Sequence, residues 1–185
     1  MDIYFKTVIT GITGRTVVIC LILAILIAAT AWRLCKRGQL TVAAAVVLPL
    51  FVSYLYFVLA ITILDRTPGE DYQYELELFW SYKEAMAGTR WLLLEILLNV
   101  VLFVPAGFCL SMLMKKRLWA VAAMAAMFSA SIEITQLVTK CGLFEFDDIF
   151  HNTLGAMAGS MIANAIERSI ACAADDIKPD RSVHF

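Results

Sequence analysis

Residues 91–139 read WLLLEILLNVVLFVPAGFCLSMLMKKRLWAVAAMAAMFSASIEITQLVT, and this stretch decides the fold class. Two apolar runs, residues 91–114 and 118–139, are separated only by the basic triplet KKR at 115–117. Each run reaches the roughly 20 residues that an α-helix needs to cross a bilayer. Because a segment in lipid must satisfy its own backbone hydrogen bonds, both runs are predicted to be membrane-spanning helices joined by a tight turn.

Three further apolar runs flank this pair, at residues 16–32, at 40–64, and from 149 until the hydropathy fades after 166. Of the 185 residues, 61% are hydrophobic and 17% are charged, whereas an ordinary soluble domain has about 45–50% and about 25%. This composition excludes a soluble enzyme and a disordered chain, and a net charge of −1 argues against a nucleic-acid partner. The sequence therefore predicts an all-α, polytopic membrane helix bundle of about five transmembrane helices.

The length of the chain limits where a functional site can lie. Five spans use more than half of the residues, so a site is expected between the helices or at their ends. Residues 1–39 are expected to form an N-terminal segment with the first span, residues 40–174 the main membrane domain, and residues 175–185 a polar cytoplasmic tail.

Charges in the connections predict the orientation of the bundle. In the connections after the first and third runs every charged residue is basic, which favours the cytoplasmic side. The connections after the second and fourth runs are rich in Asp and Glu, and we expect them outside. The N-terminus is then outside and the C-terminus cytoplasmic, with Lys6 and Arg15 as exceptions to the rule.

The outer connection at residues 70–89 reads EDYQYELELFWSYKEAMAGT and is unusually aromatic. Amphipathic rings favour the headgroup level of a bilayer. This pattern predicts an interfacial or partly re-entrant segment over the outer mouth of the bundle. An ordinary aromatic belt on a loop is the alternative.

Polar side chains within the apolar runs are expected to form a single layer. An ionisable group in a span costs roughly 2.5–3.5 kcal/mol on insertion scales, so Glu95 and Glu133 are candidate functional residues. At about 1.5 Å per residue, both lie in the outer third of the bilayer. Three amides and a base fall at the same depth: Asn99, Gln136, Asn152 and Arg66. This convergence predicts a ligand or reaction pocket, and interhelical hydrogen bonds, worth about 0.6 kcal/mol each, are the alternative.

The connection CGLFEFDDIFHN at residues 141–152 adds further polar groups to this layer. Asp147 and Asp148 immediately precede the fifth run, where acids can also cap a helix and meet its positive dipole end. His151 follows at a spacing that allows it to pair with Asp148. These oxygen-rich side chains suit a hard divalent cation, but no regular ligand spacing supports one, so no metal ligands are assigned.

Small residues occur at a regular spacing in the fifth run. Gly155 and Gly159, in the sequence GAMAG, form a GxxxG pair. Such a pair allows another helix to approach closely, so the sequence predicts a tight helix–helix contact here.

Three motifs resemble those of the VanZ-like family of bacterial membrane proteins: NVVLFVPAGF at 99–108, SIEITQ at 131–136 and FEFDDIFHNTLGAMAG at 144–159. The resemblance covers roughly residues 54–165. Many family members have an Arg and an Asp before the Asp pair, where this chain has Gly142 and Glu145. The positions that match the pattern are Asn99, Phe103, Pro105, Gly107, Glu133, Gln136, Asp147, Asp148, Asn152, Thr153 and Gly155.

The resemblance implies a multi-pass protein of the bacterial plasma membrane. It also implies a link to low-level resistance to teicoplanin, a glycopeptide that binds cell-wall precursors outside the membrane. No single biochemical activity follows from it.

Three functions remain open on the sequence. The first is binding of a lipid, a cell-wall-related ligand or a lipoglycopeptide in an outer-leaflet pocket by Arg66, Glu95, Asn99, Gln136, Asp147 and Asn152. The second is an intramembrane enzyme acting on an envelope lipid, with Glu133 as general base and Asp148 and His151 as partners. The third is a structural or assembly partner. The oligomeric state and any cofactor, including a divalent cation, are left open.

Overall fold

The computed structural model describes residues 13–114 and 117–176. The predicted cytoplasmic tail and the exception at Lys6 lie outside these ranges, apart from the first residues of the tail. The described residues form six α-helices, a short π-helical turn and two short strands. In chain order these are α2 (Gly14–Lys36), α3 (Val42–Leu59), η1 (Ala60–Leu64), β1 (Gln73–Glu75), α4 (Trp80–Met86), α5 (Trp91–Leu113), α6 (Leu118–Thr139), β2 (Leu143–Glu145) and α7 (Phe146–Asp176).

The all-α prediction is confirmed, and four of the five predicted spans are long and apolar enough to cross a membrane. These are α2, α3 continued by η1, α5 and α6. The fifth predicted span is not among the described helices that meet this criterion. It belongs to α7, which starts at Phe146, earlier than expected, and continues to Asp176. Acidic, amide, histidine and small side chains lower its hydropathy, so its membrane crossing stays a prediction.

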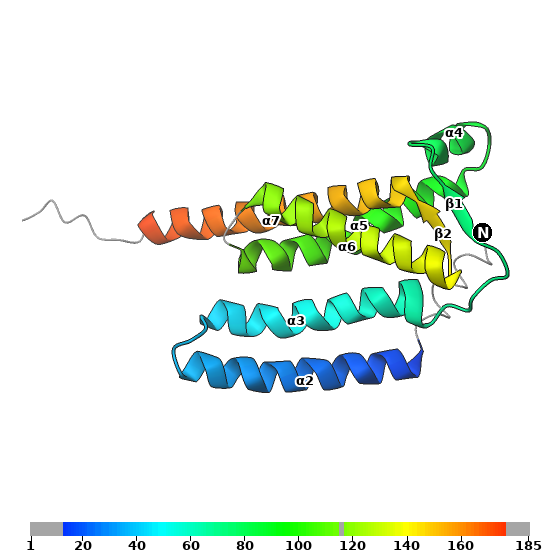
Figure 1. The fold of residues 1–185 in the computed structure, drawn as a ribbon. Helices are drawn as coiled ribbons and strands as arrows, with labels where there is room; N and C mark the ends of the chain where they lie inside the picture. Colours follow the sequence, from blue (N-terminus) through cyan, green and yellow to red (C-terminus); the bar gives the residue numbers. More distant parts are fainter. Residues whose placement is uncertain (1–12, 115–116, 177–185) are drawn as a thin grey trace, which may run out of the picture.

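The helices divide into a tight group and a peripheral hairpin (Figure 1). α5 packs against α7, α6 packs against both of them, and α3 packs on α5. α2 packs on α3 at the edge of the bundle. The buried core lies where α3, α5, α6 and α7 meet, around Val58, Phe103, Val121, Ile132 and Ala156.

Glycine makes the contact between α5 and α7 unusually close. A Cβ atom placed on Gly155 would lie 2.0 Å from the Val100 carbonyl oxygen. On Gly159 it would lie 2.0 Å from the Val104 carbonyl oxygen. Real side chains do not tolerate such distances, so the two backbones touch only because both positions are glycine. This contact confirms the close approach predicted from the GxxxG pair.

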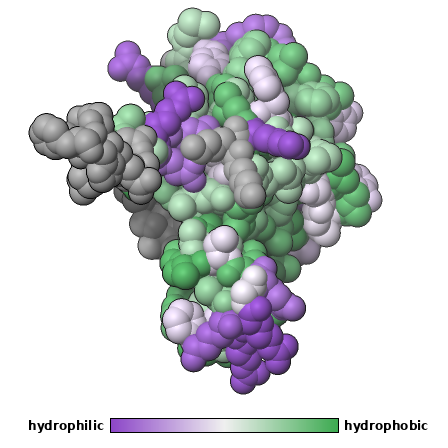
Figure 2. All heavy atoms as spheres, turned by 90° about the vertical axis from the view of Figure 1, so that its left-hand side faces the viewer, coloured by the Kyte–Doolittle hydropathy of each residue, from purple (hydrophilic) through white to green (hydrophobic). Residues whose placement is uncertain are grey.

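The α2–α3 hairpin is held at one end by Asp65, which follows η1. Its carboxylate accepts hydrogen bonds from the Thr16 hydroxyl, from Arg15 at 3.0 Å and from the Thr13 hydroxyl at 3.4 Å. Large apolar side chains along α2 are exposed, as expected of a helix that faces lipid. At the other end of the hairpin, Figure 2 shows hydrophilic side chains over the turn between α2 and α3, where Arg33, Lys36 and Arg37 lie.

Two short parallel strands were not expected from the sequence. β1 pairs with β2 so that Tyr74 lies opposite Phe144. The Gly69 amide donates to the Lys140 carbonyl oxygen at 2.8 Å and extends the attachment. The pairing fastens residues 69–75 to the connection before α7, which brings α4 to the same end of the bundle as the start of α7 (Figure 1). We call the end of the bundle at which β1 and β2 lie the strand end.

Candidate functional site

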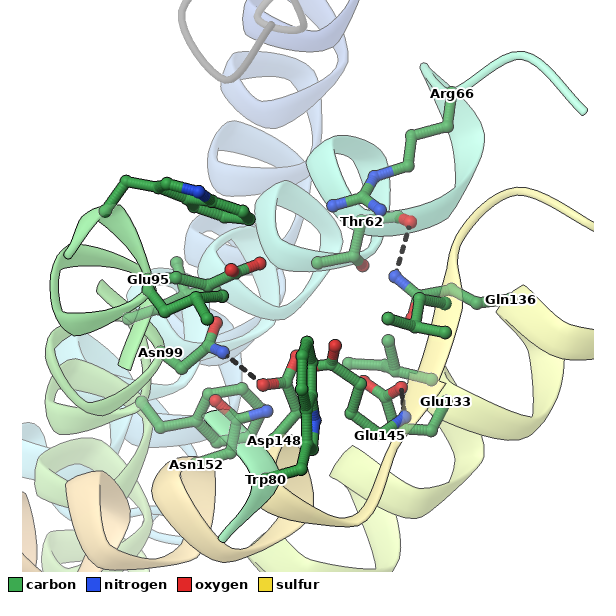
Figure 3. Close-up of a pocket in the computed structure, with 16 residues that line it drawn as sticks. Thr62, Arg66, Trp80, Glu95, Asn99, Glu133, Gln136, Glu145, Asp148 and Asn152 are labelled. Atoms are coloured by element: carbon green, nitrogen blue, oxygen red, sulfur yellow. Dashed lines mark hydrogen bonds between the residues drawn. The ribbon is translucent and has the colours of Figure 1, made fainter. Parts of the chain in front are cut away.

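A pocket of about 270 Å³ lies at the strand end of the bundle. Its walls come from η1 and Arg66 just beyond it, from α5, α6, β2 and α7, and from α4 (Figure 3). We call it the acidic pocket, because four carboxyl groups line it. The lining residues are Thr62, Arg66, Trp80, Trp91, Leu92, Glu95, Asn99, Leu102, Phe103, Ile132, Glu133, Gln136, Leu143, Glu145, Asp148 and Asn152.

Hydrogen bonds hold the carboxyl groups in place. The Asn99 amide donates to Asp148 Oδ1 at 2.5 Å, which joins α5 to α7. The backbone amide of Glu145 donates to Glu133 Oε2 at 3.1 Å, which joins β2 to α6. Glu133 is only 2% exposed and Glu145 only 6%. Buried polar groups with fixed partners have few orientations, so the arrangement is preorganised.

Glu145 holds a proton under neutral conditions. Burial, the largest cause, and the negative charges of Asp148 and Glu95 together raise its pKa to about 9. A side-chain hydrogen bond with Asp148 acts in the same sense. The neutral Glu145 therefore donates to the neighbouring carboxylate and reduces the repulsion that a fully ionised pocket would suffer.

Arg66 is the one basic side chain among the described residues that line the pocket. Its Nε donates to the Ile61 carbonyl oxygen at 3.4 Å, and its guanidinium lies against Gly142. A Cβ atom on Gly142 would lie 3.0 Å from Arg66 Nη1. The absence of a side chain at Gly142 therefore leaves room for Arg66 at the rim of the pocket.

Two buried polar atoms of the lining have no hydrogen-bond partner within the described part of the chain: Asn152 Oδ1 and Trp80 Nε1. Asn152 is 5% exposed, and its amide nitrogen donates to Ser129 Oγ at 2.8 Å. Its free oxygen is an acceptor, and the indole nitrogen is a donor. A hydroxyl group satisfies both kinds of atom, because it donates and accepts.

Seven of the nine predicted site residues line the acidic pocket: Arg66, Glu95, Asn99, Glu133, Gln136, Asp148 and Asn152. Glu95 and Glu133 are thus brought to one pocket from two helices. Gln136 is oriented by a hydrogen bond from its side-chain nitrogen to the Thr62 carbonyl oxygen at 3.0 Å. That these residues bind a ligand stays a prediction, since their placement alone does not test it.

The structure places the other two, Asp147 and His151, outside the pocket. Asp147 accepts from the backbone amides of Phe79 at 2.5 Å and Ser81 at 3.2 Å, and from the Ser81 hydroxyl at 2.5 Å. It holds the start of α4 in position. His151 Nε2 lies 2.8 Å from the Tyr82 hydroxyl, and its ring packs among aromatic rings. Of the predicted group, Glu133 and Asp148 line the acidic pocket and His151 does not.

The sequence did not identify Glu145, Trp80, Trp91 or Thr62 as site residues. Of these four, only Glu145 was noted in the sequence, as a position where the chain departs from the motif that it resembles. Among the described residues, no group of three or more His, Cys, Asp or Glu side chains is arranged to hold a metal ion.

The fold and the pocket together define a multi-pass helical membrane protein with an acidic pocket between its helices at one end. A family model described as VanZ/LLP1 matches residues 51–167, and the chain belongs to this family. The match begins within α3, leaves out α2, and includes every residue that lines the acidic pocket. No curated protein and no solved structure matches the chain.

Proposed function

We propose that this protein binds the polar head of an envelope lipid or a cell-wall-related amphiphile at the outer leaflet of a bacterial plasma membrane. Through this binding it lowers susceptibility to glycopeptide and lipoglycopeptide antibiotics such as teicoplanin. The observation that carries the proposal is the preorganised acidic pocket, which the family match covers completely.

The distribution of basic residues supports an outer position for the pocket. Arg33 and Lys36 lie in the last turn of α2, Arg37 caps it and Arg117 precedes α6, all at the end of the bundle away from the strands. Basic residues in short connections favour the cytoplasmic side. The strand end, and with it the acidic pocket, then faces outward.

The chemistry of the lining supports a hydroxyl-rich or cationic head. Carboxylates and the Asn152 oxygen accept hydrogen bonds, whereas neutral Glu145, the Trp80 indole and Arg66 donate. A polyol or an amino-polyol can use both sets. A phosphate group in the pocket would lie among four carboxyl groups, with Arg66 as its basic partner. The repulsion between the negative charges makes this unfavourable unless a cation accompanies the phosphate.

An intramembrane enzyme is the second candidate. The observation that favours it is the placement of Glu145 and Asp148 beside Glu133 in one pocket, because a neutral acid next to a carboxylate can serve general acid–base catalysis. His151, which contacts Tyr82 instead, takes no direct part in this version. A purely structural role is the third, and it assigns the polar layer to packing alone.

A substitution series separates these functions. Glu133→Gln and Asp148→Asn keep the size of the side chain and remove its ionisable carboxyl group, and Arg66→Ala removes the basic group. Glu84→Gln and Asp71→Asn are matched controls, because both side chains are exposed and lie outside the pocket. Each variant is measured for its level in the membrane, its thermal unfolding and the teicoplanin susceptibility of the cells.

A lost phenotype with normal folding in the pocket variants supports a site and contradicts the structural role. A retained phenotype in all three overturns both site functions. Lipid extracts of cells with and without the protein then test catalysis. An unchanged set of lipid species counts against the enzyme and leaves binding in place.

A further inference from the structure

A second pocket, of about 170 Å³, lies deeper in the bundle and is almost entirely apolar. We call it the apolar pocket. It is bordered by Phe51 and Leu55 of α3, by Leu110 of α5, by Met124 and Phe128 of α6, and by small residues. The small residues are Ala106, Gly107, Ala125 and Ala156, and their size leaves the space that the larger side chains surround.

Phe103 lines both pockets. It is 2% exposed, and its ring lies 6.1 Å from that of Phe128, measured between centroids. On α5, Asn99 lies one turn before Phe103, and Gly107 lies one turn after it, so all three share a helix face. The acidic and apolar pockets are therefore consecutive along one face of α5 and share Phe103 in their linings.

The apolar pocket reaches well into the membrane-spanning part of α5. Phe103 and Leu110 are about 10 Å apart along the helix axis at about 1.5 Å per residue. Met124, at its border, is 40% exposed, so one wall of the pocket reaches the lipid-facing surface of the bundle. A cavity with no polar partners does not hold ordered water, whereas a hydrocarbon chain suits it.

We propose that the ligand is one molecule with two parts: a hydroxyl-rich head in the acidic pocket and a hydrocarbon chain in the apolar pocket. The proposal rests on the proposed function, and it adds the class of ligand. Its basis is the shared Phe103 together with the two unpartnered polar atoms, Asn152 Oδ1 and Trp80 Nε1, in the lining of the head pocket.

The hydrocarbon chain of the ligand contributes to binding through its covalent attachment to the head and through its fit to the apolar pocket. A chain that leaves the bilayer for the apolar pocket gains little from the hydrophobic effect, because lipid tails are as apolar as the lining. Covalent linkage to a bound head raises its effective concentration at the pocket. Neither pocket alone distinguishes such a molecule from ordinary lipid, but the two together do.

Photo-crosslinking tests this arrangement in the full chain, reconstituted in phosphatidylcholine nanodiscs. The probe is an alkyl glucoside that carries a diazirine on the end of its chain, and a second probe carries the diazirine next to the sugar. Mass spectrometry locates the labelled residues. We expect the chain-end probe to label the residues that border the apolar pocket, and the sugar-end probe to label the acidic pocket.

Two substitutions on α6 form a matched pair. Met124→Trp fills the border of the apolar pocket, whereas Met127→Trp places the same ring on a lipid-facing position that is 66% exposed and outside both pockets. We expect Met124→Trp to reduce chain-end labelling roughly tenfold, equivalent to about 1.4 kcal/mol. Met127→Trp should leave it unchanged. Asp148→Asn should reduce labelling at both ends, because the head anchors the chain.

Each other outcome has a definite meaning. If the sugar-end probe labels the acidic pocket while the chain end labels Met127 as often as Met124, the two-part ligand is overturned and the head site stands. Chain-end labelling that persists in Asp148→Asn also overturns it, since the apolar pocket would then hold lipid independently. If neither pocket of the wild-type chain is labelled, the two-part ligand is overturned and the head site loses its support for this class of ligand.

Discussion

The α5–α7 pair and the α2–α3 hairpin are both pairs of long helices in contact, yet they are held together differently. In the first pair, glycines bring backbone against backbone. In the second, the helices meet through side chains, and a polar group at one end, centred on Asp65, fastens them. One pair forms two walls of the acidic pocket, whereas α2 contributes nothing to its lining.

This difference indicates which part of the chain is specialised for the site. A close contact fixes the axial position of two helices, because a shift by one residue would drive side chains into backbone. Asn99 and Asp148 can then meet at 2.5 Å across that contact. The family match includes α5 to most of α7 and leaves out α2, in agreement with a rigid pair that carries the site and a peripheral helix that supports it.

The largest effect is expected from filling the glycine contact. In Gly155→Ala the new methyl group meets the Val100 carbonyl oxygen, so the helices must separate, at a cost of about 3 kcal/mol in the free energy of unfolding. Gly14→Ala is the control, because a Cβ there meets nothing within 4 Å. Thermal unfolding in detergent micelles measures both. Equal stability of the two variants would contradict the tight contact.

The glycine contact and most of the pocket follow from local sequence signals. The GAMAG spacing predicts the first, and the depth of Glu95, Asn99, Glu133 and Gln136 along their helices predicts the second. Helical periodicity places a side chain both by depth and by face, so helices with fixed directions can be aligned from sequence alone.

The part of the site that the sequence did not predict depends on contacts between segments that are distant in the sequence. Trp80 reaches the pocket because β1 pairs with β2, and no local pattern in either short strand encodes that pairing. Asp147 and Asp148 are adjacent, and successive helical residues point about 100° apart. One therefore binds α4 while the other lines the pocket. The sequence allowed these acids to cap the helix that follows them, whereas in the structure Asp147 accepts from amides at the start of α4.

The second largest effect is expected at Asp147. Asp147→Asn removes the charge that receives two backbone amides and the Ser81 hydroxyl, and hydrogen bonds to a charged group are worth about 1.5–3 kcal/mol. We expect a loss of about 2 kcal/mol, together with release of α4 from the pocket. Faster proteolysis within residues 76–90 would report that release. Asp71→Asn, on an exposed side chain, should change neither measurement.

A pH-dependent difference is expected next, from Glu145. Its pKa is about 9 in the folded protein, raised by burial and by the charges of Asp148, Glu95 and Glu133, against 4.5 for an ordinary Glu. The folded state then holds a proton that the unfolded state has released. Its stabilising contribution is present below about pH 4.5 and is lost progressively as the pH rises to about 9.

Glu145→Gln should therefore flatten the fall in melting temperature between about pH 5 and about pH 9. Thermal unfolding across this range, with Glu84→Gln as the exposed control, measures the difference. If wild type and Glu145→Gln fall with the same slope, Glu145 is ionised in the folded protein and does not share a proton with Asp148.

The smallest effect is expected at the ion pair of the peripheral hairpin. Arg15 lies 3.0 Å from Asp65, but its side chain is 69% exposed, so solvent screens the attraction. Arg15→Gln should change the free energy of unfolding by less than about 1 kcal/mol, and added salt should not enlarge the change.

Thr16 is 1% exposed and donates to the same carboxylate. Thr16→Val leaves that buried acceptor with one partner fewer and should cost about 1–3 kcal/mol. If Arg15→Gln proves the more destabilising of the two, charge attraction holds the α2–α3 hairpin together. The hairpin would then differ from the glycine-packed α5–α7 pair in depending on an ion pair and not on buried contacts.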